Sequence, residues 1–204
     1  MGDEPGRAPP AELIGDSELL ADAYDLAAAA HAGQTRKDDD SPYLTHPLRV
    51  AELIAAAGVG EEAEAAALLH DVVEDSDVGV DEIERRFGPE VARIVSALTE
   101  DEAIAGYEER KVEHRARVEA AGPLAVAVYS ADKLANLRDM RGLYAEVGER
   151  AAERFKAPLD LRSRLWLEDA ELAERALPGT ELATDLRAEA TGFARDRAAA
   201  ATAG

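Results

Sequence analysis

Apolar positions along most of the chain recur every three or four residues, which is the spacing of an amphipathic α-helix. The segment DSELLADAYDLAAAAHAG, residues 16–33, begins with a capping Asp or Ser and ends at a glycine. The segment THPLRVAELIAAAG, residues 45–58, begins with a capping threonine followed by a proline in its first turn, and also ends at a glycine. EEAEAAALLHDVVED, residues 61–75, has the same helical spacing. These patterns predict three consecutive helices.

The rest of the chain continues in the same way, without long β-branched alternation. Runs of alanine mixed with Glu and Arg favour helix, and further helices are predicted at residues 80–87, 89–100, 107–121, 123–140, 158–176 and 181–195. We therefore predict an all-α fold with one helical bundle at residues 16–177. Residues 1–15 are expected to be flexible, and residues 178–204 to form a C-terminal helix and a tail that is loose after Phe193.

Composition excludes several classes of protein. The 204 residues are enough for one domain with a proper core. The absence of cysteine excludes disulfides and cysteine-ligated zinc or iron–sulfur sites. A net charge of −20 argues against general nucleic-acid binding, which needs a basic face. No segment is apolar enough to span a membrane and the start does not resemble a signal peptide, so a cytoplasmic location is expected.

The segment LLHDVVED, residues 68–75, places a histidine and three carboxylates in a stretch that otherwise predicts buried core. A carboxylate in an apolar setting costs several kcal/mol, so such groups are paired, solvated or bound to a metal. In one continuous helix, His70 would share a face with Glu74, and Asp71 with Asp75. His70 and Asp71 would point about 100° apart, which lets both reach one ion beside the helix.

More ligands must come from elsewhere in the chain. His46 begins the helix predicted at residues 45–58, and Asp132 interrupts the apolar run LAVAVYSADKLANL. Together with His70 and Asp71 they would form a mixed nitrogen and oxygen site, which suits Mn, Fe, Co or Zn rather than Ca. Structural roles are the alternatives: His46 as a cap or a core histidine, and Asp132 as the ion-pair partner of Lys133.

The other two histidines are assigned structural roles. His31 ends the first predicted helix. His114 lies in the charged segment EERKVEHRAR, which is predicted to face solvent. Neither is therefore expected to bind a metal.

Three blocks of the chain resemble one protein family. They are AAHAGQTRKDDDSPYLTHPLRVA, AALLHDVVEDSDVGVDEIERRFGPEVARIVSALTED and SADKLANLRDMR, and they span roughly Ala21 to Arg141. In this order and spacing they resemble the metal-dependent HD hydrolase domain of the RelA/SpoT alarmone enzymes. The resemblance implies a single HD-domain helical bundle. About sixty residues follow Arg141, too few for the family's synthetase domain, so a stand-alone small alarmone hydrolase is expected.

The resemblance also assigns roles to individual residues. The implied ligands of a catalytic Mn²⁺ are His46, His70, Asp71 and Asp132, with Glu74 and Asp75 orienting or deprotonating the attacking water. The implied substrate contacts are Arg36, Lys37 and Asn136, to which Asp139 is added from the stand-alone branch. Further cationic candidates are Lys133, Lys111, Arg110 and Arg138, and the alternative for each of these is surface pairing with the many Glu residues. The implied reaction removes the 3′-diphosphate of ppGpp or pppGpp and gives pyrophosphate with GDP or GTP.

Three departures from the family pattern leave the substrate open. Tyr129 and Ser130 replace a Lys-Leu pair, which removes a positive charge near the metal. Ala135 replaces a His or Tyr, which is expected to widen or reshape the pocket, and three acids at residues 38–40 follow the basic pair. An adenosine alarmone or the 2′-phosphate of NADPH is therefore an alternative substrate. A catalytically silent nucleotide sensor is the alternative from outside the enzymes.

Overall fold

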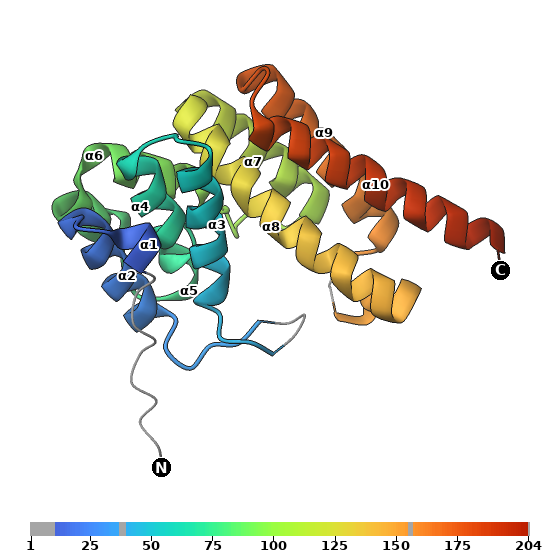
Figure 1. Ribbon diagram of the computed structural model, residues 1–204, viewed down its shortest axis with the longest axis horizontal. Helices are drawn as coiled ribbons and strands as arrows, with labels where there is room; N and C mark the ends of the chain where they lie inside the picture. Colours follow the sequence, from blue (N-terminus) through green and yellow to red (C-terminus); the bar gives the residue numbers. More distant parts are fainter. Residues whose placement is uncertain (1–10, 37–39, 155–156, 204) are drawn as a thin grey trace, which may run out of the picture.

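The computed structural model describes residues 11–36, 40–154 and 157–203, where helices joined by short loops form the fold. Figure 1 shows the helices in chain order. They are α1 (Ala11–Ile14), α2 (Glu18–Ala30), α3 (Thr45–Ala56), α4 (Glu61–Leu69), α5 (Val72–Asp75), α6 (Val80–Leu98), α7 (Tyr107–Ala121), α8 (Pro123–Val147), the 3₁₀ helix η1 (Gly148–Arg154), α9 (Leu159–Ala176) and α10 (Glu181–Ala203). The predicted all-α fold is confirmed.

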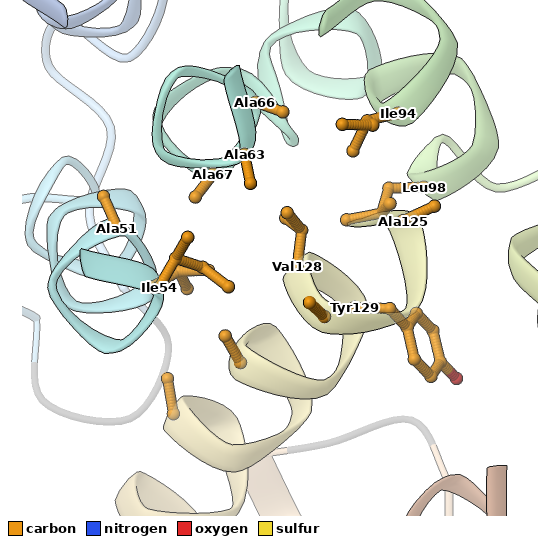
Figure 2. Close-up of a cluster of buried hydrophobic side chains, with 14 of the residues drawn as sticks. Ala51, Ile54, Ala63, Ala66, Ala67, Ile94, Leu98, Ala125, Val128 and Tyr129 are labelled. Carbon is orange, nitrogen blue, oxygen red and sulfur yellow. The ribbon is translucent and has the colours of Figure 1, made fainter. Parts of the chain in front are cut away.

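Helix α8 is the centre of the molecule. It contacts α3, α4 and α6 on one side, and α7, α9 and α10 on the other, so it crosses between the two groups of helices in Figure 1. Figure 2 shows the core where Ile54 of α3, Ala66 of α4 and Ile94 of α6 meet Val128 of α8. Burial of each isoleucine stabilises the fold by about 1.5–3 kcal/mol. The small alanine side chains of α4 let the backbone of α4 lie close to that of α8, the helix that carries Asp132.

The helix predicted over residues 61–75 is broken in two, so that prediction was wrong in detail. Helix α4 ends at Leu69 and α5 begins at Val72, which leaves His70 and Asp71 at the junction. The backbone N–H of Asp75 still bonds to the carbonyl of Asp71 at 3.0 Å. The break therefore falls at two of the predicted ligands, although both keep near-helical backbone angles.

Helix α6 joins the two helices predicted at residues 80–87 and 89–100 across a kink at Gly88. Gly88 has a φ of 88°, which is in the left-handed region where glycine is favoured, and Pro89 follows it. The predicted break was therefore correct, although the helices on either side remain one element.

The structure differs from the expectations for the two ends of the chain at residues 11–15 and 194–203, whereas residues 1–10 and Gly204 lie outside the described residues. Helix α1 lies within residues 1–15, which were expected to be flexible, and its Ile14 is buried. Helix α10 continues to Ala203 instead of becoming loose after Phe193. The Phe193 ring is buried, with its centroid 5.4 Å from both Tyr144 and Trp166. Among the described helices, none is long and apolar enough to cross a membrane.

Candidate metal centre and adjoining cavity

Three predicted ligands come together from three separate parts of the fold. His46 lies in the first turn of α3, His70 at the junction of α4 and α5, and Asp132 near the middle of α8. Each offers one donor atom, and these atoms all lie within 4.8 Å of one another. Nε2 of His46 is 3.1 Å from Oδ1 of Asp132, and Nε2 of His70 is 3.9 Å from the same oxygen.

Asp71 adds a second carboxylate to this cluster. Its Oδ2 atom lies 3.2 Å from Nε2 of His70 and 3.9 Å from Nε2 of His46. The Tyr43 hydroxyl donates a hydrogen bond of 2.6 Å to the same oxygen, which fixes the carboxylate. The four residues named as metal ligands therefore surround one point.

The donor set fits a divalent cation. Nδ1 of His70 lies 2.8 Å from the carbonyl oxygen of Ala67, so in the neutral ring that binds a metal this nitrogen would carry the proton and Nε2 would present its lone pair to the cluster. Nε2 of His70 is buried and faces the carboxylates of Asp71 and Asp132. Burial would lower the pKa of His70, but Asp71 and Asp132 outweigh this effect and raise it to about 9. The site thus favours positive charge at its centre, which a bound metal would supply.

Asp132 also contacts polar side chains of its own helix. Its Oδ2 atom pairs with Lys133 Nζ at 2.6 Å, and its Oδ1 atom accepts a hydrogen bond from Asn136. The ion pair with Lys133 was the structural alternative for Asp132. The structure contains both the ion pair and the ligand arrangement, because Oδ2 of Asp132 pairs with Lys133 while Oδ1 faces the two histidines.

Glu74 and Asp75 lie on α5 directly after the junction, and both are exposed. Glu74 accepts a hydrogen bond from the backbone N–H of Glu100. Loss of hydration raises the pKa of the Glu74 carboxyl to about 7, although the residue as a whole is exposed, and the nearby Asp71 and Glu100 charges also raise it. Loss of hydration and the charge of Asp71 also raise the pKa of Asp75. Both carboxylates are therefore open to water, with altered proton affinity.

The predicted nucleotide contacts form a second cluster. Nη2 of Arg36, in the loop before α3, donates to Oδ1 of Asn136 at 3.3 Å and to Oδ2 of Asp139 at 3.0 Å. Arg49 donates to the other Asp139 oxygen at 2.7 Å. Asp139 thus holds two arginines in place. Lys37 lies outside the described residues.

A cavity of about 280 Å³ lies beside the metal cluster. Tyr43, Lys133 and Asn136 line it and also contact the metal-cluster carboxylates. Its cationic lining residues are Arg36, Lys111, Arg115, Lys133 and Arg162, a concentration of positive charge in a chain whose net charge is −20. Such a pocket suits an anionic ligand.

Arg115 and Arg162 were not singled out from the sequence. Each is one of several arginines in a charged helix, and they reach the cavity from α7 and α9. Their local sequence carries no signal that separates them from surface arginines. The departure at Ala135 does not widen this cavity, because Ala135 lines a separate hollow between α3 and α8 with Arg49 and Asp139.

The prediction for His31 is confirmed by the structure, whereas the prediction for His114 is not. His31 caps the end of α2 and its Nδ1 atom lies 2.8 Å from the Gln34 side chain, so its structural role is confirmed. The prediction that His114 faces solvent was wrong, because the residue is only 2% exposed. Its ring packs edge-on against Tyr129 of α8 with 5.2 Å between centroids.

Comparison with known proteins identifies the family. A family model described as HD domain matches residues 23–157. The chain is 40% identical over 128 residues to guanosine-3′,5′-bis(diphosphate) 3′-pyrophosphohydrolase MESH1 of Homo sapiens, covering 61% of this chain and 71% of the human protein. It is 33% identical over 165 residues to the guanosine-3′,5′-bis(diphosphate) 3′-pyrophosphohydrolase of Aquifex aeolicus, covering 78% of this chain and 24% of that protein.

A solved structure agrees with these matches. It is described as a metazoan ortholog of SpoT that hydrolyzes ppGpp and plays a role in starvation responses. The match has a TM-score of 0.69 and 26% sequence identity, and covers 89% of this chain and 96% of that one. The resemblance drawn from the three sequence blocks is thereby confirmed, and the chain belongs to the HD-domain family, in which it is similar to the ppGpp 3′-pyrophosphohydrolases.

Proposed function

We propose that this protein is a Mn²⁺-dependent hydrolase that removes the 3′-diphosphate of ppGpp or pppGpp, giving pyrophosphate and GDP or GTP. One observation carries the proposal: a cluster of two histidines and two carboxylates opens beside a cavity lined by five cationic side chains. The similarity to proteins named as ppGpp 3′-pyrophosphohydrolases gives the substrate.

The proposed ligands are His46, His70, Asp71 and Asp132. A metal held there would lower the pKa of a bound water and neutralise phosphoryl oxygens. Imidazole and carboxylate donors suit several transition metals, and Mn²⁺ is proposed from the family resemblance.

Glu74 is proposed as the general base and Asp75 as the group that orients the water. A base works best when its pKa is close to the working pH, and the pKa of about 7 at Glu74 meets this condition. Its hydrogen bond from the Glu100 backbone fixes the carboxylate. Glu74 would take the proton from the attacking water, while Asp75 on the same short helix would hold that water by a hydrogen bond.

The cavity is proposed to hold the nucleotide. Arg36 offers a planar cation that can stack on a base or pair with a phosphate, and Asn136 and Asp139 hold its guanidinium. Lys133 would neutralise the phosphoryl group nearest the metal ligands, because its ammonium already lies at Asp132. Lys37 is proposed as a further contact from the resemblance alone. The absence of nucleic-acid binding and the cytoplasmic location stay predictions from the sequence.

The test is product analysis by ion-exchange chromatography. Purified protein, with Mn²⁺ or with a chelator, is given ppGpp, the adenosine analogue and NADPH in parallel. The proposal predicts release of pyrophosphate and GDP from ppGpp that depends on Mn²⁺ and exceeds turnover of the other two. Faster turnover of NADPH or the adenosine compound would assign the site to that substrate instead. Binding without any turnover by the folded, metal-loaded protein would favour the nucleotide sensor.

A further inference from the structure

Asp169 is a buried carboxylate in the wall of a cavity whose other charged lining residues are cationic. It lies on α9 and is 4% exposed. Its Oδ1 atom accepts hydrogen bonds from the Tyr129 hydroxyl at 2.8 Å and from Nη1 of Arg115 at 3.1 Å. A negative charge here opposes the binding of an anion by simple Coulomb repulsion. The presence of Asp169 in this wall is therefore better explained by the two groups that it holds through hydrogen bonds.

One group that Asp169 holds is Arg115. This arginine reaches the cavity from α7, and it pairs with Asp169 through Nη1 and with Glu168 through Nη2. A guanidinium has five N–H donors in a rigid plane, so the two ion pairs fix its orientation and leave donors for a ligand. Arg115 is thus a cation held in place on the α7 and α9 side of the cavity.

The other group is Tyr129, which connects Asp169 to the metal-cluster side. Figure 2 shows the Tyr129 ring extending from α8 away from Val128, with its hydroxyl oxygen at the far end. The ammonium of Lys133 lies 4.5 Å from the centre of this ring, within the range of a cation–π contact. Lys133 also pairs with Asp132. The Tyr129 ring therefore supports one cavity cation, and its hydroxyl bonds to the carboxylate that supports another.

We propose that Tyr129 and Asp169 are positioning residues that hold Lys133 and Arg115 on two walls of one anion subsite, which prefers a diphosphate over a single phosphate group. The proposal rests on the proposed function, because the subsite adjoins the same candidate metal centre. Lys133 is placed for the phosphoryl group nearest the metal ligands, and Arg115 for the group beyond it.

A substitution at Asp169 distinguishes positioning from charge alone. If Asp169 only adds negative charge, then Asp169→Asn makes the cavity more positive and tightens anion binding. If it positions Arg115, the same change releases that guanidinium and weakens the binding of a diphosphate. The two explanations predict effects of opposite sign, and Asn preserves the shape of the side chain.

The experiment measures binding of inorganic pyrophosphate and inorganic phosphate to the full, Mn²⁺-loaded protein by calorimetry, with free Mn²⁺ held constant. Asp169→Asn should weaken pyrophosphate binding about tenfold, the usual effect of losing a hydrogen bond to a charged group, and should change phosphate binding much less. Tyr129→Phe keeps the aromatic ring beneath Lys133 but loses the hydrogen bond to Asp169. It should therefore weaken the preference for pyrophosphate over phosphate by a smaller factor. Glu174→Gln is the matched control: this exposed acid of α9 pairs with Arg187 and does not line the cavity, so its loss should change binding by no more than about twofold.

Thermal unfolding of each variant accompanies the titrations. An unchanged or tighter affinity of Asp169→Asn for pyrophosphate would overturn the proposal. If that variant does not fold, Tyr129→Phe and Arg115→Gln decide, since an unchanged preference in both would overturn it equally. Turnover of ppGpp by the unsubstituted protein is measured separately. Its absence beside an intact pyrophosphate preference would contradict the proposed function and leave the subsite standing.

Discussion

Nε2 of His46 lies 3.1 Å from Oδ1 of Asp132, although the two residues belong to helices far apart in the chain. Both side chains are polar and buried, so the packing of apolar surface does not explain their position. Their proximity depends on the packing of α3 against α8, and it places His70 and Asp71 around the same point. The centre of the bundle is therefore organised around a site that favours a cation.

Asp71 is expected to be required for metal binding. Asp71→Ala removes the carboxylate that faces both histidines, and loss of one ligand should weaken metal binding by tenfold or more, since removing even an outer-shell partner costs about 10–100-fold. Elemental analysis of the purified, dialysed protein measures the bound metal. Asp77→Ala is a suitable control, because this exposed acid lies outside the cluster. Full metal content in Asp71→Ala would exclude Asp71 as a ligand.

The pH dependence of turnover is expected to report on Glu74. Its carboxyl group has a pKa raised to about 7, first by loss of hydration and then by nearby acids. A general base acts as the carboxylate, so kcat for ppGpp should rise as the pH increases through about 7 and fall below it. In Glu74→Gln, turnover should drop by about 10²–10⁴-fold and the residual activity should lose this limb. If kcat of the Glu74→Gln variant still rises with pH at the same place, that rise belongs to another titrating group.

Asp139 is expected to act on substrate affinity through Arg36. Asp139→Asn removes the charge that holds Arg36 and Arg49, so KM for ppGpp should rise about tenfold while kcat changes little. Steady-state kinetics separates the two constants. Asp185→Asn is the matched control, since this partly exposed acid of α10 pairs with Arg138 of α8. Equal KM values in the two variants would argue against a role for Asp139 in holding Arg36.

Helix α10 is expected to stabilise the fold. Phe193 is fully buried and packs edge-on against Trp166 and Tyr144, so Phe193→Ala should lower the free energy of unfolding by about 3–5 kcal/mol. Urea denaturation measures this loss. Val112→Ala, at an exposed position of α7, should change it by less than about 0.5 kcal/mol. A similarly small loss for Phe193→Ala would mean that α10 is not part of the cooperative core.

Local sequence was sufficient for most helices, because caps, prolines and glycines act over a few residues. The kink at Gly88 and the ends of α7 and α9 could be read in this way. The break between α4 and α5 could not, since His70 and Asp71 keep near-helical backbone angles and no glycine or proline marks the junction. The continuation of α10 to Ala203 also escaped prediction, because an alanine-rich end shows no apolar stripe.

The candidate metal ligands could be predicted from the sequence, whereas several residues of the adjoining cavity could not. His46, His70, Asp71 and Asp132 could be named because a histidine or acid in an apolar run is unusual enough to need a reason. Arg115 and Asp169 could not, because in sequence they are ordinary members of charged helices. Only the packing of α7 and α8 against α9 buries Asp169 and brings it to Tyr129. Tertiary contacts of this kind leave no local pattern.

Hydrolysis at the metal centre is best tested by release of pyrophosphate from ppGpp, measured for the metal-loaded protein and for the Glu74→Gln/Asp75→Asn double variant. Both proteins should fold and bind the same amount of Mn²⁺, because neither changed residue is a proposed ligand. We expect GDP and pyrophosphate in equal amounts from the unsubstituted protein, and a loss of turnover in the variant. Undiminished turnover in the variant, or products other than GDP and pyrophosphate, would contradict this expectation.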